Sequence, residues 1–160
     1  MFTSQNKIMR EIQKIGQLFA DLQQGDCWVG LNMQQVLKDV TAEKAAIRLH
    51  EKGNCIWQLV NHLIYWRKTV MIRLQGRHAE PPMPDMYLPD ELTEASWQTT
   101  LLHFEEVYRQ LSELIIAFDE SLLDTASPIK GQTYYQLLLG CLQHDAYHMG
   151  QMVVLKKDLL

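Results

Sequence analysis

Apolar residues recur along this chain at alternating steps of three and four, the spacing that places them on one face of an α-helix. The first segment with this pattern predicts a helix over residues 4–24, whose apolar face consists of Ile8, Ile12, Ile15, Phe19 and Leu22. Gly25 interrupts the pattern. From there to Gly53 the periodicity is limited to Met33–Val40, so we expect a long connection with one or two short helices.

A second long helix is predicted from Asn54, a suitable N-cap, to about Leu74. Its apolar face consists of Cys55, Ile56, Leu59, Leu63, Trp66 and Val70. The segment from Gly76 to Asp90 then carries four prolines, which remove backbone donors and prevent a helix. This linker is long enough to cross the length of a helical bundle.

The third helix has the most regular pattern, through Trp97, Leu101, Phe104, Tyr108, Leu111, Ile115, Phe118 and Leu122. After a short break, Thr133 and Gln136 stand at capping-box spacing before a fourth helix. The apolar face of this helix, which we call its apolar stripe, consists of Leu137, Cys141, His144, His148, Met152 and Leu155.

Four long helices without a convincing strand predict a single all-α domain over residues 1–160, a four-helix bundle. The short third connection makes the last two helices antiparallel, and the proline-rich crossover allows helices two and three to run the same way. We therefore expect the order up-down-down-up.

The composition indicates a soluble cytoplasmic protein. The sequence has 47% hydrophobic and 21% charged residues and a net charge of −4, with no apolar run long enough for a membrane span. There is no basic cluster for nucleic acid and no secretory signal. Three cysteines without CxxC spacing favour reduced thiols over a disulfide framework.

Three histidines on the predicted apolar stripes are candidate metal ligands. His144 and His148 are spaced i, i+4, so their imidazoles lie one turn apart on the same side of a helix. His62 lies on the stripe of the second helix, near its middle. Each histidine alone is explained by a hydrogen bond inside the core. The three together favour a metal site, and three imidazoles leave positions open for water or substrate. His50, His78 and His103 lie off the stripes.

Other residues near these histidines are weaker candidates. Trp66, Cys141 and Gln151 share their helical faces and are candidates to line a pocket, although core packing is the favoured explanation for the aromatic ring and the thiol. Asp145 superficially gives HDAYH the form of a zinc-peptidase motif, but it is interpreted as a surface acid or as a group behind the ligands. Trp28, on the first connection, is expected to cover the site or to plug one end of the bundle.

Several segments resemble the DinB/YfiT-like superfamily of metal-binding bundles: NHLIYW around His62, HDAYHMGQ from His144 to Gln151, ELTEASW, and the proline-rich crossover. The resemblance implies an up-down-down-up bundle with one divalent ion, zinc, nickel or iron, at His62, His144 and His148. It also implies a homodimer.

Two functions remain open at this point. The first is an enzyme whose metal activates water or a low-molecular-weight thiol for attack on a small-molecule substrate, as a thiol S-transferase or hydrolase. The second is a non-catalytic metal-binding or ligand-binding module of a stress response, since no strong general base is visible beside the ligands.

Overall fold

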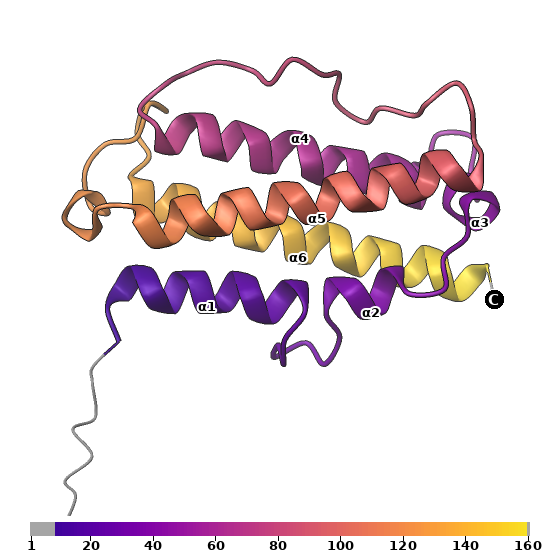
Figure 1. Ribbon diagram of the computed structural model, residues 1–160, viewed down its shortest axis with the longest axis horizontal. Coiled ribbons are helices and arrows are strands. Elements are labelled where there is room, and N and C mark those ends of the chain that lie inside the picture. Colours follow the sequence, from indigo (N-terminus) through magenta and orange to yellow (C-terminus); the bar gives the residue numbers. More distant parts are fainter. Residues whose placement is uncertain (1–8, 160) are drawn as a thin grey trace, which may run out of the picture.

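The computed structural model describes residues 9–159, and within them all regular secondary structure is helical (Figure 1). The elements are α1 (Glu11–Gln23), α2 (Met33–Leu37), α3 (Ala42–Ala46), α4 (Ile56–Leu74), α5 (Glu94–Ala117), the 3-10 helix η1 (Glu120–Leu122) and α6 (Tyr134–Asp158). A single isolated bridge joins Ala126 to Thr133 in the described part. The predicted all-α class is confirmed.

The four long helices lie side by side, with α2 continuing the line of α1 (Figure 1). In this view α1 and α6 run from left to right, whereas α4 and α5 run from right to left. The proline-rich segment leaves one end of α4 and spans the bundle to the start of α5. This path brings the crossover over α4, the helix that carries His62.

Helix boundaries follow the capping chemistry, with two corrections to the prediction. The box at α6 is confirmed: the Thr133 hydroxyl accepts from the Gln136 N–H at 3.2 Å, and Gln136 Oε1 accepts from the Thr133 N–H at 2.9 Å. The N-cap of α4 is Cys55 and not Asn54, because the Gln58 side chain accepts from the Cys55 N–H at 3.4 Å.

The third helix ends earlier than its pattern predicts. It stops at Ala117 because Phe118 adopts an extended backbone, and Leu122 falls in η1, where it is 42% exposed. At the other end of the chain, α1 begins at Glu11, and Ile8 lies outside the described residues. The short helix expected within Met33–Val40 is confirmed as α2, whereas α3 lies beyond that periodic segment.

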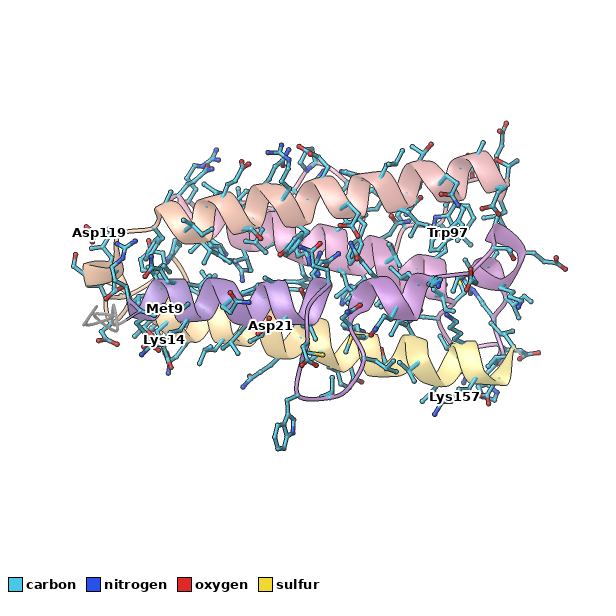
Figure 2. All side chains as sticks on the ribbon, turned by 60° about the horizontal axis from the view of Figure 1, so that its bottom comes forward. Met9, Lys14, Asp21, Trp97, Asp119 and Lys157 are labelled. Atoms are coloured by element: carbon cyan, nitrogen blue, oxygen red, sulfur yellow. The ribbon has the colours of Figure 1, made fainter. Side chains whose placement is uncertain are left out.

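The core has two apolar halves. One half, near the start of α1, includes Ile15, Leu111 and Leu138, and the other includes Trp57 and Trp97. Figure 2 shows Trp97 toward the end of the bundle opposite Asp119. No described helix is both long enough and apolar enough to cross a membrane.

A buried polar layer separates these halves. Arg67 lies between Leu63 and Val70 on α4, and Asp145 lies between Cys141 and Met149 on α6. The Arg67 Nε donates a hydrogen bond to Asp145 Oδ2 at 2.9 Å. A second guanidinium nitrogen of Arg67 donates to Gln23 of α1. The layer lies at the level along α4 and α6 where the three histidines meet.

Candidate metal centre

The three histidines predicted from the helical stripes meet between α4 and α6. His62 Nε2 lies 3.0 Å from His144 Nε2, which lies 3.1 Å from His148 Nε2. One nitrogen from each ring lies within 4.8 Å of the other two. His62 and His148 are buried, and the His144 side chain is 28% exposed. The other histidines of the described part do not join this cluster.

Two side chains hold the outer nitrogens of this cluster. His62 Nδ1 lies 2.6 Å from Asp85 Oδ1, and His148 Nδ1 lies 2.6 Å from Gln151 Oε1. Both partners are acceptors, so each ring places its proton on Nδ1 and turns the lone pair of Nε2 toward the cluster. Metal-binding histidines in proteins commonly have such partners, which fix the ring and its tautomer.

Asp85, which contacts the histidine cluster through His62, is a residue that the sequence patterns do not reveal. It lies in the proline-rich crossover, which is fastened to α4 by two hydrogen bonds: Gln58 donates to the Met86 carbonyl at 3.3 Å and Asn61 donates to the Tyr87 carbonyl at 2.8 Å. The Met86 N–H also donates to Asp85 Oδ1 at 2.7 Å. The signal in the sequence is weak: Asp85 is an acidic residue in the crossover, and the crossover has to pass over the helix that carries His62.

The cluster fits a divalent ion on chemical grounds. With Nδ1 protonated on His62 and His148, two Nε2 lone pairs face His144 Nε2, which has at most one proton to share between them. A cation among the three nitrogens removes this repulsion. The Nε2 separations of 3.0 Å between His62 and His144 and 3.1 Å between His144 and His148 are close to the roughly 3.3 Å expected between two imidazole nitrogens bonded to one tetrahedral ion at about 2.05 Å. Imidazole ligands suit zinc, iron, nickel and copper.

The surroundings of His148 favour the neutral form of its imidazole. Burial lowers the pKa of His148 below its ordinary value, and the positive charges that His144 and His62 acquire on protonation lower it further. Hydrogen bonding to Gln151 and the charge of Asp145 oppose this shift in pKa without reversing it. The His148 imidazole is therefore neutral at physiological pH, the form that can bind a metal.

A cavity of about 340 Å³ adjoins the histidines between α4 and α6. It is lined by His62, Trp66, Val70, Arg73, Gln132, Leu137, Gly140, Cys141 and His144. Trp66 and Cys141 thus lie where the stripes place them, whereas Gln151 is not part of the lining and contacts His148 instead. The volume lies within the range of small-molecule sites.

Cys141 lines this cavity as a neutral thiol. Burial raises the pKa of Cys141 well above its ordinary value, and the neighbouring Asp145 carboxylate raises it further. A thiol must be deprotonated to act as a nucleophile or metal ligand. At neutral pH Cys141 therefore acts as a small apolar group.

Asp145 differs from one of its two predicted positions, and Trp28 differs from both of its predicted positions. Asp145 is completely buried and paired with Arg67, so its interpretation as a surface acid is wrong. Its free Oδ1 lies 3.9 Å from His144 Nδ1, which also has no partner. Trp28 is fully exposed at 101%, so it neither covers the site nor plugs the bundle. A pattern of apolar residues cannot distinguish an exposed loop aromatic from a buried one.

Comparison with known families agrees with this architecture. The family model described as DinB superfamily matches residues 30–152, a region that includes all three histidines and the crossover. No curated protein and no solved structure gave a match. Since the match covers most of the chain and the fold is helical throughout its described part, the protein belongs to the DinB superfamily.

Proposed function

We propose that the protein is a metal-dependent enzyme in which His62, His144 and His148 bind one divalent ion, zinc, nickel or iron. The observation that carries this proposal is the convergence of three imidazole nitrogens, two of them oriented by outer acceptors, on the wall of a small-molecule cavity. A divalent ion supplies Lewis-acid chemistry there, lowering the pKa of a water or thiol so that it is nucleophilic at neutral pH.

The chain's own residues hold and enclose the reactants. Asp85 and Gln151 keep the two imidazoles in the orientation that ligation needs. Val70, Leu137 and the Trp66 ring give the cavity apolar walls that exclude water from the reacting group. The reaction types that suit this site are transfer of a low-molecular-weight thiol to an electrophile and hydrolysis.

A non-catalytic metal-binding module is the second candidate, and one observation favours it. The residues that line the cavity include no carboxylate, and the nearby Asp145 is neutralised by Arg67. The site therefore has no free general base of its own, and proton transfer would depend on the activated water or thiol itself.

Metal content tests the site directly. Elemental analysis of protein purified without an affinity tag is expected to give about one divalent ion per chain, since three imidazoles form one site. Replacing His144 or His148 by Ala is expected to abolish this occupancy while circular dichroism stays helical. His103→Ala, on α5 away from the cluster, is the matched control. Full occupancy in both variants would contradict the assignment.

Turnover separates the two candidate functions. The metal-loaded protein is combined with bacillithiol, glutathione or coenzyme A and with chlorodinitrobenzene or an epoxide as the electrophile. Product formation that disappears on removal of the metal and in His62→Ala supports the enzyme. Activity that survives removal of the metal contradicts the mechanism, and stoichiometric metal binding without turnover of any pair supports the binding module.

A further inference from the structure

The cavity beside the histidines contains a cation without a counterion. Arg73, in the last turn of α4, is half-buried and lines the cavity. The arginine ion pairs within residues 9–159 involve Arg67 and Arg109, and Arg73 forms none. Its Nε is buried and has no hydrogen-bond partner. A buried N–H without an acceptor is costly, so this group calls for an explanation.

Two further lining residues leave polar atoms unsatisfied. Trp66 Nε1 and Gln132 Oε1 are both buried without a partner. The guanidinium carbon of Arg73 lies over the Trp66 ring at 5.7 Å from its centroid, so the two unpaired donors belong to neighbouring side chains. Three lining residues of this cavity therefore carry hydrogen-bonding atoms that no described side chain satisfies.

The part of the cavity between Arg73 and the histidines is apolar. The α4 side contributes His62, Trp66, Val70 and Arg73 at helical steps of four, four and three, so one face of the helix runs from the cluster to the cation. Across from it lie Leu137 and the protonated thiol of Cys141. A Cβ added at Gly140 would meet no atom within 4 Å, which shows open space on the α6 side.

We propose that this site takes a small organic anion whose carboxylate is held by Arg73 and the indole N–H of Trp66 and whose reacting end lies at the histidines. The proposal rests on the proposed function and names its substrate class. The unpaired guanidinium matches a carboxylate, with which arginine forms short charge-assisted hydrogen bonds. The apolar walls match a hydrocarbon body between the two ends.

The distances limit the size of the ligand. One step of 5.7 Å leads from the guanidinium carbon to the Trp66 ring, and a second step of 5.7 Å leads from that ring to the His144 ring. Together these two distances set an upper limit on the separation between the guanidinium carbon of Arg73 and the His144 ring. A chain of a few carbon atoms between carboxylate and reacting group is sufficient. A neutral analogue of the same length would leave the buried N–H groups unpaired and is expected to bind more weakly.

Mercaptocarboxylates on cobalt-loaded protein test this proposal by binding alone. The thiolate is followed by its charge-transfer absorption with cobalt, and 6-mercaptohexanoate is compared with 6-mercaptohexanol, alongside a series of shorter acids starting at mercaptoacetate. Wild-type protein is expected to prefer the carboxylate by about tenfold or more, the range for a charge-assisted pair.

Variants assign this preference to individual side chains. Arg73→Gln is expected to reduce it to about twofold or less, while Arg77→Gln, at an exposed arginine in the following loop, keeps it. Trp66→Phe keeps an aromatic side chain, smaller than indole, but loses the N–H, and it is expected to weaken carboxylate binding severalfold. It also provides the test if Arg73→Gln does not fold.

Filling the cavity provides a second, independent test. Gly140→Leu is expected to abolish binding of both thiols with cobalt retained, because its side chain enters the open space of the cavity. Gly150→Leu, at an exposed glycine of the same helix, is the control.

Failure of the two proposals is distinguishable. If wild-type protein binds no cobalt, the metal proposal fails, and calorimetry with hexanoate and hexanol then tests Arg73 in the metal-free protein. If cobalt binds but the acid and the alcohol bind equally well, or if Arg73→Gln keeps the preference, the substrate class proposed here is overturned and the metal site stands.

Discussion

At the scale of single residues, the candidate centre depends on side chains that do not belong to it. Asp85 and Gln151 accept hydrogen bonds from imidazoles whose other nitrogens face the cluster. A carboxylate behind an imidazole raises its basicity and keeps its lone pair directed at the metal. The contribution of Asp85 can therefore be measured without changing any ligand.

Asp85→Ala is expected to lower metal affinity by about 10- to 100-fold, the usual effect of losing such a partner. Competition with a chelating dye measures the affinity. Asp90→Ala, at an exposed acid of the same crossover, is the matched control for the loss of one negative charge. Equal affinity in Asp85→Ala and the control would show that the contact with His62 has no role in binding.

Acid is expected to weaken metal binding, because protons compete for the same nitrogen lone pairs. Burial lowers the pKa of His148, so this ring stays neutral to a lower pH than a free histidine, whose pKa is about 6.5. In the metal-free protein, the unfolded state consequently binds more protons just below that pH, and stability falls as pH decreases through the window. Titration of affinity between about pH 8 and about pH 5 measures the effect, and a flat profile would exclude ligation by histidine.

At the scale of elements, α6 supplies two of the three histidines and also contains two glycines. A Cβ added at Gly140 or Gly150 would meet no atom within 4 Å, whereas a Cβ added at Gly25, after α1, would lie 2.8 Å from the backbone of Asp21. Glycine inside a helix weakens the helix because of its conformational freedom in the unfolded chain. Gly140 and Gly150 therefore lower the stability of α6, and no steric contact requires glycine at either position.

Gly140→Ala and Gly150→Ala are each expected to stabilise the protein by about 0.5–1 kcal/mol. Gly25→Ala is expected to be destabilising, since its methyl group requires the backbone to shift. Urea unfolding of the three variants measures the differences. Destabilisation by Gly140→Ala would mean that the helix backbone itself requires glycine there.

At the scale of the whole molecule, the buried pair of Arg67 and Asp145 joins the helices behind the site. Their side chains are 2% and 0% exposed. The Arg67 guanidinium also contacts Gln23 of α1 and lies 4.3 Å from the centroid of the Phe104 ring of α5. Charges so deeply buried are tolerated only when paired, so removing one partner leaves the other unsatisfied.

Asp145→Ala and Arg67→Met are each expected to lower the free energy of unfolding by about 3–5 kcal/mol. The double variant is expected to cost less than the two single changes together, because neither charge then remains unpaired. Lys14→Ala, which breaks an exposed pair with Glu11, is the control and is expected to cost at most about 1 kcal/mol. Single changes as mild as this control, measured in urea with metal removed, would contradict the structural role of the pair.

The helices and the inward direction of the histidines were predictable because both depend on local spacing. A helical residue faces the same side as those three and four positions away, so the stripes of α4 and α6 alone placed His62, His144 and His148 in the interior. The residue types then suggested a metal. The match to the DinB superfamily over residues 30–152 agrees with the predicted family, and the three imidazoles lie close enough together to hold an ion.

Contacts between residues far apart in the sequence were determined only by the tertiary structure. The partner of His62 comes from a crossover 23 positions away, and Asp145 lies 78 positions from Arg67. Such pairs depend on the path of the linker and the rotation of each helix, which involve the whole chain at once. For the same reason the helical pattern did not single out Arg73, which lies in the last turn of α4, where a cation is favourable. Only the packed helices placed it, unpaired, in the cavity beside the histidines.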